Sequence, residues 1–289
     1  MVKLDIFVER GRNMNGNLYL VSTPIGNLED ITLRAIRILK EVDVIAAEDT
    51  RQTLKLLNHF DINKPLTSFF RHNENKKGEY IISLLKEGKN IALVSDAGTP
   101  AISDPGEELV SLAIEEEITV IPVPGPVAAT SGLIISGLPT GRFTFEGFLP
   151  MNKKNRKDRL ESLEQEQRTM IFYEAPHKLK STLKDMREFL GNRKIALARE
   201  MTKIHEEVIR TTLDEAIIKY EEENPKGEFV LIVAGYDGKT EKDVFWKDLT
   251  IQEHYDYYLA QGEDRMNATK KVAKDRGVSK RDIYGELNS

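Results

Sequence analysis

The chain of 289 residues lacks cysteine and long apolar runs. The absence of cysteine excludes disulfides, thiolate ligands for zinc or iron–sulfur clusters, and thiol nucleophiles. No apolar run approaches the roughly 18–20 residues that span a bilayer. Residues 1–5 are charged and lack the apolar core of a signal peptide. We therefore expect a cytoplasmic protein.

An excess of positive charge is also missing, because the chain has 42 Lys and Arg and 47 Asp and Glu, which gives a net charge of −5. Proteins that coat nucleic acid generally are usually basic, so this balance argues against non-specific binding. Two segments reverse the sign: residues 152–159 hold five bases and one acid, and residues 265–281 hold seven and one. Such runs are usually solvated surface, and the first is most simply a solvated loop. Against an acidic background they become candidate RNA phosphate contacts. The side chains concerned are Lys153, Lys154, Arg156, Lys157, Arg159, Lys270, Lys271 and Arg281.

Several catalytic signatures are missing as well. The five histidines show no metal-ligand spacing, so we predict no metal site. No G-x-S-x-G elbow supports a serine hydrolase. The turn at residues 22–27 follows an apolar run, yet it is neither a G-x-G-x-x-G nor a G-x-x-x-x-G-K-[ST] loop. Dinucleotide and P-loop nucleotide binding are therefore poorly supported.

Short apolar runs alternate with helical patterns along the chain. In the first half, strands are predicted at residues 18–21, 44–47, 91–94 and 119–123, and helices at 32–42, 54–57, 80–87 and 104–116, with a polar loop at 61–78. This alternation predicts an α/β fold with a parallel sheet covered on both faces. The second half has predicted strands near 143–147, 169–173, 194–199, 206–211 and 228–234. Hairpin-like spacing around 199–211 predicts that this sheet is mixed.

The length is typical of about two domains. We expect an N-terminal extension at 1–16, an N-terminal α/β domain at 17–124, a C-terminal α/β domain at 125–238 and a helical C-terminal domain at 245–289. Residues 239–249 are charged and linker-like. The predicted helices at 251–261, 266–276 and 280–287, with Ser279 as an N-cap, resemble a helix–turn–helix.

The candidate functional residues lie at the strand ends, because ligands of parallel sheets bind at the carboxyl ends of the strands. Residues 95–106 contain two glycines, two prolines and two Ser-Asp pairs. Glycine lets backbone approach a ligand and proline makes it rigid, which favours a functional loop over a structural turn. Asp104 has a structural alternative as a helix cap. Asp49 has the same alternative, and Pro176 is placed as in an ordinary first helical turn.

Seven motifs together match one family. They are TPIGNLEDIT at 23–32, EDTR at 48–51, SDAGTP at 95–100, PGP at 124–126, YEAPH at 173–177, REMTK at 199–203 and GEFVL at 227–231. The sequence resembles the small-subunit ribosomal RNA methyltransferase I family. These are the 2′-O-ribose members of the tetrapyrrole-methylase-like, class III S-adenosylmethionine methyltransferases. The resemblance covers roughly residues 17–236, and Met201 stands where leucine is usual.

The resemblance implies two α/β domains of the tetrapyrrole methylase type with a short helical C-terminal extension, and a homodimer. It implies S-adenosyl-L-methionine bound between the two domains. It also implies a cytidine ribose in 16S ribosomal RNA as the target. The assembled small subunit is the expected substrate, and naked RNA stays open as the alternative. The cofactor contacts it predicts are Pro24, Ile25, Asp96, Thr99, Pro100, Ala101, Ile102, Ala128, Ala129, Thr130, Tyr173, Ala198, Val233 and Ala234.

Methyl transfer to a ribose hydroxyl is an in-line displacement, so positioning and electrostatics supply most of the catalysis. A general base would assist by accepting the hydroxyl proton. The candidates are Glu48 and Asp49, then Glu174 and Glu200, with Arg51 holding an acid or a substrate phosphate.

Two alternatives stay open. A methyltransferase of the same fold acting on a tetrapyrrole would need an apolar cleft and no basic segment, and residues 48–51 and 153–159 favour RNA over it. A non-catalytic RNA-binding factor would use the C-terminal helices, and the intact loop motifs argue against that.

Overall fold

The computed structural model describes residues 15–71, 73–238, 246 and 249–287. These form two compact units, Met1–Gly235 and Tyr236–Ser289, which are treated separately below. Most of the expected N-terminal extension, at residues 1–14, and most of the expected linker, at 239–245 and 247–248, lie outside the described residues. No helix in the described residues is long and apolar enough to cross a membrane.

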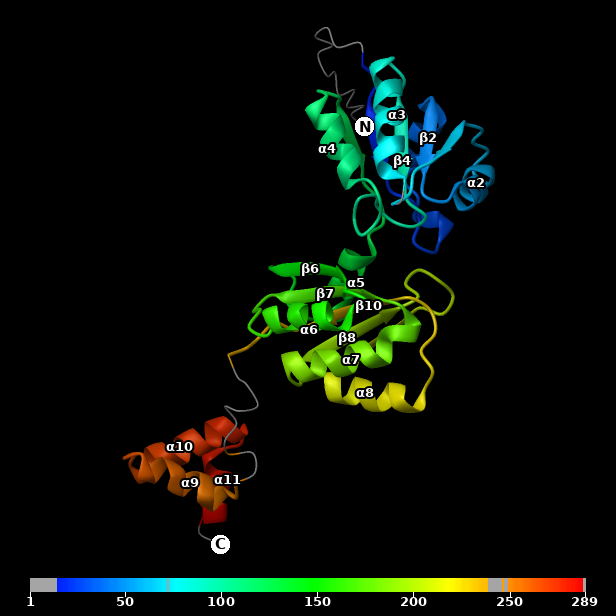
Figure 1. The fold of residues 1–289 in the computed structure, drawn as a ribbon. Coiled ribbons are helices and arrows are strands. Elements are labelled where there is room, and N and C mark those ends of the chain that lie inside the picture. The colour runs from blue at the N-terminus through cyan, green and yellow to red at the C-terminus, as the bar shows by residue number, and fades with distance from the viewer. Residues whose placement is uncertain (1–14, 72, 239–245, 247–248, 288–289) are drawn as a thin grey trace, which may run out of the picture. The chain divides into compact units, whose positions relative to one another are not determined.

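The first sheet of the larger unit is entirely parallel. Its strands are β1 (Leu18–Val21), β2 (Val44–Ala47), β3 (Leu66–Ser68), β4 (Ile91–Val94) and β5 (Val120–Val123), in the order β3-β2-β4-β1-β5. One face packs against α1 (Leu33–Glu41) and α2 (Thr50–His59), the other against α3 (Glu74–Lys86) and α4 (Glu107–Glu115). Burial on both faces explains the continuous apolar strands and confirms the predicted parallel sheet (Figure 1).

Two local predictions in this half were wrong. Residues 61–78 were expected to be loop, but they contain β3 and the start of α3. A three-residue, half-buried strand is too short to show a period, and the first turn of α3 is polar. Asp104 does not cap α4, because the helix begins three residues later, after Gly106 with φ 140°, and no side chain caps it.

The second sheet is mixed, as predicted. Its strands are β6 (Phe143–Phe148), β7 (Thr169–Glu174), β8 (Lys194–Arg199), β9 (Glu207–Thr212) and β10 (Phe229–Val233), in the order β6-β7-β10-β8-β9. Strand β6 runs parallel to β7, and the other pairs are antiparallel. Helix α5 (Ala128–Ser136) packs on one face. Helices α6 (Lys153–Ser162), α7 (Pro176–Leu190) and α8 (Leu213–Glu222) cover the other.

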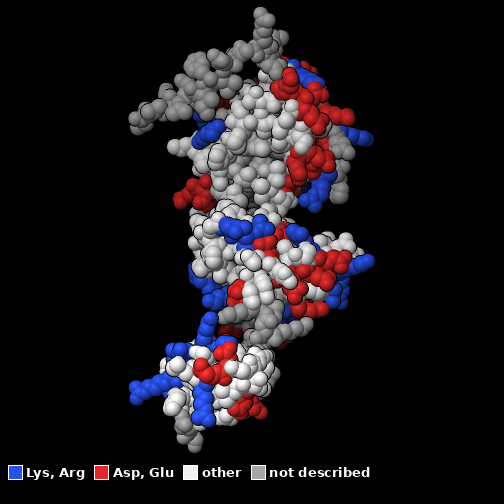
Figure 2. All heavy atoms as spheres, turned by 90° about the vertical axis from the view of Figure 1, so that its left-hand side faces the viewer, with Lys and Arg blue, Asp and Glu red and all other residues white. Residues whose placement is uncertain are grey.

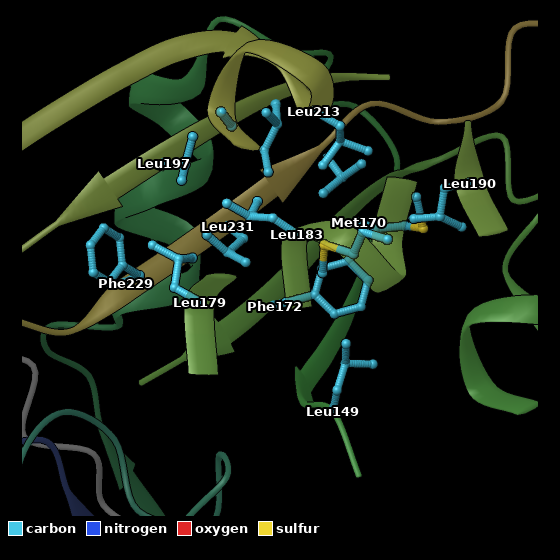
Figure 3. Packing of buried hydrophobic residues seen from close by; sticks show 14 of the residues in the cluster. Leu149, Met170, Phe172, Leu179, Leu183, Leu190, Leu197, Leu213, Phe229 and Leu231 are labelled. Atoms are coloured by element: carbon cyan, nitrogen blue, oxygen red, sulfur yellow. The ribbon is translucent and has the colours of Figure 1, made fainter. Parts of the chain in front are cut away.

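The larger core of this half lies under α6, α7 and α8. Phe172 on β7 and Leu231 on β10 meet Leu183 of α7 there, and all three are fully buried (Figure 3). Removing the side chain of a buried leucine lowers the free energy of unfolding by about 2–5 kcal/mol. This packing therefore stabilises the arrangement of the strands that carry the site. The opposite face, under α5, is left to carry the site described below.

The smaller unit is a group of three helices. They are α9 (Ile251–Ala260), α10 (Arg265–Arg276) and α11 (Lys280–Leu287), packed around Val272, Ala273 and Ile283. Gly277 ends α10 in the left-handed conformation that glycine favours. The Asp282 amide donates to Ser279 Oγ at 3.2 Å, which confirms the predicted cap.

Candidate functional site

Three loops at the carboxyl edge of the first sheet are tied together by hydrogen bonds. After β1, the backbone of Thr23 pairs with that of Gly98 in both directions, with N–O distances of 2.8 and 3.0 Å. Ser22 Oγ lies 2.7 Å from Thr99 Oγ1, which also donates to the Pro126 carbonyl at 3.2 Å. The loops that follow β1, β4 and β5 therefore form one connected wall.

The wall requires close backbone approach and unusual conformations. A Cβ on Gly125 would lie 2.7 Å from the Cβ of Ser22, so only glycine fits without movement. In the loop after β4, Ala101 and Ser103 both have φ of 67°. Left-handed non-glycine residues cost on the order of 1–3 kcal/mol each and cluster at ligand sites. The composition that predicted a functional loop at 95–106 thus corresponds to a strained, tightly held backbone.

A cavity of about 510 Å³ opens against this wall, lined by residues of both sheets. The first half contributes three carboxylates, those of Glu48, Asp96 and Asp104. The second half contributes apolar and aromatic side chains, among them Phe148, Tyr173, Met201 and Phe229, together with Lys203 and the carboxylates of Glu174, Glu200 and Glu228. Carboxylates therefore line the cavity from both halves, while most of its apolar and aromatic surface comes from the second.

The acidic side chains perturb one another. Burial raises the pKa of Glu48, and the charge of Asp96 raises it further. Burial, followed by the charge of Glu48, raises the pKa of Asp104 from 3.8 to about 6. Arg71, whose Nη2 donates to the Ser103 carbonyl at 3.3 Å, partly offsets both shifts. A carboxylate of raised pKa in a cleft is a candidate acid–base group.

Asp49 and Arg51 lie outside the cavity lining and bind each other. Asp49 caps α2 by accepting from the Arg51 amide at 2.8 Å, and its other oxygen lies 2.7 Å from Arg51 Nη2. The structural alternative for Asp49 is therefore confirmed. Hydrogen bonds from Arg51 lower the pKa of Asp49 to about 2, which makes this carboxylate a poor proton acceptor.

Glu174 and Glu200 line the cavity but already have partners. The Glu174 carboxylate accepts from Thr182 Oγ1 at 2.5 Å and from the Ala175 amide at 2.8 Å. Glu200 Oε1 accepts from the Glu228 amide and from Lys203 Nζ, both at 3.0 Å. The first of these bonds is the main cause of the lowered pKa of Glu200. Among the four predicted bases, Glu48 is thus the best suited to take a proton.

The structure places the predicted cofactor contacts in three groups. Those that line the cavity are Ile25, Asp96, Thr99, Ile102, Ala128, Tyr173 and Ala198. Those beside these residues in the chain, but outside the lining, are Pro24, Pro100, Ala101, Ala129 and Thr130. The third group, Val233 and Ala234, lies at the far end of the second sheet. Strand β10 is antiparallel to β7 and β8, so Phe229 is the residue beside Glu174 and Arg199.

Sequence reasoning missed several lining residues, among them Phe148, Met201, Lys203 and Phe229. Phe229 could have been predicted to line the cavity if β10 had been recognised as antiparallel, because the amino end of such a strand lies beside the carboxyl ends of its neighbours. Lys203 is held at 3.0 Å from carboxylate oxygens of both Glu200 and Glu228. A Cβ on Gly26 would lie 2.5 Å from Lys203 Cγ, so the first turn touches this loop directly.

The basic segment at 152–159 forms the helix α6 rather than a loop, and three of its cations are paired. Arg156 binds Asp185 at 2.6 Å, Lys157 binds Glu188 at 3.2 Å and Arg159 binds Glu146. Lys153 and Lys154 are exposed and form no ion pair within the described part of the chain. Figure 2 shows acidic side chains gathered along one side of the first α/β half, and acidic and basic side chains mixed on the second.

In the smaller unit the predicted cations differ in their surroundings. Lys271 is paired with Glu263 at 2.6 Å and lies over the ring of Tyr258. Lys270 and Arg281 are exposed on α10 and α11. Among the described residues no group of His, Asp or Glu is arranged to hold a metal ion, and the absence of a metal site stays a prediction.

Comparison with known proteins agrees with this architecture. Residues 17–217 match the family model described as tetrapyrrole (corrin/porphyrin) methylases. Among solved structures, diphthine synthase covers 76% of this chain and 90% of its own, at 14% identity and a TM-score of 0.59. The uroporphyrin-III C-methyltransferase of Thermus thermophilus, complexed with S-adenosylhomocysteine, covers 75% and 97%, at 19% identity and a TM-score of 0.53. At these identities the likeness shows the fold.

Relatives of higher identity carry one name, ribosomal RNA small subunit methyltransferase I. That of Halalkalibacterium halodurans is 57% identical over 94% of this chain and 95% of its own. That of Bacillus subtilis is 51% identical over 95% and 94%, and that of Escherichia coli O157:H7 is 46% identical over 94% of each. The chain therefore belongs to the tetrapyrrole methylase family and, within it, to the ribosomal RNA small subunit methyltransferase I group.

Proposed function

We propose that this protein methylates the ribose 2′-hydroxyl of a cytidine in 16S ribosomal RNA of the small ribosomal subunit, with S-adenosylmethionine as the methyl donor. The names of the relatives support the RNA and the methyl transfer. The observation that carries the proposal is the cavity itself, whose lining combines the half-buried carboxylate of Glu48 with apolar and aromatic side chains such as Phe148 and Tyr173. Such a cavity holds a proton acceptor close to a site for an organic cation.

The residues present fit this cofactor. When bound, S-adenosylmethionine supplies an electrophilic methyl group on a positively charged sulfur. The carboxylates of Asp96 and Asp104 favour a cation in the cavity. The Tyr173 hydroxyl accepts from the Ala129 amide at 3.1 Å, so its own proton is available for a ligand. Burial raises the pKa of Tyr173, which keeps that proton in place.

Glu48 is the residue we assign to accept the proton of the 2′-hydroxyl. Burial and the charge of Asp96 raise its pKa, so the carboxylate is a stronger base than an exposed glutamate. Asp49 positions the strand end through its amide, which donates to Asp96 Oδ1 at 2.9 Å. Glu174 and Glu200 hold the β7 and β8 ends of the second sheet in place through their hydrogen bonds.

Phosphate binding is assigned to the exposed lysines at the start of α6 and to Lys270 and Arg281. We further propose that the protein acts in the cytoplasm as a homodimer. The resemblance of the sequence motifs to this family supports a second copy of the chain as partner. Sedimentation at micromolar concentration tests the dimer, and a single species of 32.9 kDa would contradict it.

The function is tested by methyl transfer from labelled S-adenosylmethionine to small ribosomal subunits purified from cells that lack this gene. A porphyrinoid is offered in parallel reactions. We expect label in 16S RNA as a 2′-O-methylcytidine and none in the porphyrinoid. Label on a base, or in the porphyrinoid alone, would contradict the proposal.

A further inference from the structure

Strand β6 carries a β-bulge that changes which side chains share a face. Phe145 is the partner of Ile171 and Phe148 is the partner of Tyr173, with the register shift between Phe145 and Gly147. In a regular strand, residues three apart point to opposite faces. The extra residue places Phe145 and Phe148 on the same face, the one that α5 covers and that borders the cavity.

The bulge is held where the two halves of the larger unit meet. Gly147 has φ of 60°, and a Cβ there would lie 3.2 Å from Ser103 Oγ. Ser103 is itself one of the left-handed residues of the loop after β4. Bulges occur often beside active sites, where they redirect a side chain. Here the redirected side chain is Phe148, which packs against Tyr173 of the same sheet.

Phe148 lines the cavity, yet 57% of it is exposed. Its inner edge packs against Tyr173, with ring centroids 5.6 Å apart and planes at 65°. Phe145 packs on the same tyrosine at 5.1 Å. Tyr173 therefore supports the phenylalanine ring from one side and leaves the rest open at the cavity mouth, which suits a planar ligand.

We propose that Phe148 is the platform on which the nucleobase of the methylated nucleotide stacks. This inference rests on the proposed function and assigns a specificity-determining contact to it. Proteins that read unpaired RNA bases commonly stack them on aromatic rings. The exposed Lys153 and Lys154, which begin α6 five residues further along the chain, are cations available for the phosphates of such a nucleotide.

The test compares Phe148→Ala with Phe148→Tyr, using small subunits from cells lacking this gene as substrate. Stacking on one base predicts that the alanine variant raises KM for the subunit about 5- to 150-fold with little change in kcat. The tyrosine variant is expected to keep the wild-type KM. Phe143→Ala is the matched control, because Phe143 lies on the same strand, is 41% exposed and is outside the cavity lining.

Each other outcome has a defined meaning. An unchanged KM in Phe148→Ala, or an equal rise in Phe143→Ala, would overturn the stacking platform. A weaker calorimetric affinity of Phe148→Ala for S-adenosylmethionine would show that the ring contacts the cofactor and would overturn the proposal. A change in sedimentation would show that the ring contacts a second copy of the chain and would overturn it as well. Failure of the wild-type protein to methylate the subunit would refute the proposed function, independently of Phe148.

Discussion

Replacing Glu48 by glutamine tests the assignment of the proton acceptor. Glutamine keeps the shape of the side chain and cannot accept the hydroxyl proton. A general base contributes about 10²- to 10⁴-fold, so kcat should fall by that factor. Burial and the charge of Asp96 raise the pKa of Glu48, because the ionised form is disfavoured there. The neutral glutamine relieves this repulsion, so thermal stability should not decrease.

The pH dependence of kcat gives a second readout. In the wild-type protein kcat should fall as the pH drops through the raised pKa of Glu48, since the protonated carboxyl cannot accept a proton. The variant should lack this limb of the profile. Single-turnover methyl transfer at several pH values measures both effects without interference from product release.

Asp49→Asn is the matched control, since Asp49 is the neighbouring carboxylate but lies outside the cavity lining and is paired with Arg51. It should keep the helix cap, because asparagine caps a helix as well as aspartate does, lose only the ion pair with Arg51, and keep most of its kcat. If Glu48→Gln retains kcat within about threefold while cofactor affinity is unchanged, the assignment of Glu48 as general base is wrong.

Four further outcomes are expected. The pKa of Asp104 is raised to about 6, so its ionised form destabilises the fold at higher pH. Asp104→Asn should therefore raise the free energy of unfolding by about 1–2 kcal/mol at pH 7.5 and leave it unchanged at pH 4. Equal effects at both pH values would refute the raised pKa. In the wild type, calorimetry should show that the affinity for S-adenosylmethionine increases as the pH rises through about 6, where Asp104 ionises. Asp104→Asn should lack this increase. Gly125→Ala should weaken cofactor affinity at least tenfold, because its Cβ would lie 2.7 Å from that of Ser22 and displace the joined loops; wild-type affinity would contradict the tight fit. Leu231→Ala should lower the free energy of unfolding by about 2–5 kcal/mol in denaturant titrations while the remaining folded enzyme keeps its kcat.

The sequence predicted the parallel sheet because its strands are continuous apolar runs with both faces buried. It also predicted the loop after β4, because the carboxyl edge of a parallel sheet is where glycine, proline and acidic residues gather for a ligand. Glu48 and Asp96 were recognised as site residues from the motifs at these strand ends and the family resemblance that they carry, and both line the cavity. The mixed second sheet followed from hairpin-like spacing alone.

The features that sequence reasoning missed depend on tertiary structure. Strand β3 is too short to show a period, and its place at the sheet edge comes from pairing with β2. The direction of β10 decides that Phe229, rather than Val233, meets the cavity. Phe148 reaches it through a bulge that no local pattern marks. The partners of Glu174 and Glu200 likewise become visible only in the folded chain.

Mapping 2′-O-methylation across 16S ribosomal RNA from cells with and without this gene tests the proposed reaction directly. One cytidine is expected to lose its ribose methyl group without the gene and to regain it when the wild-type protein is restored. Restoration with Glu48→Gln should leave that ribose largely unmodified. An identical methylation map in both strains, or the loss of a base methylation instead, would contradict the account.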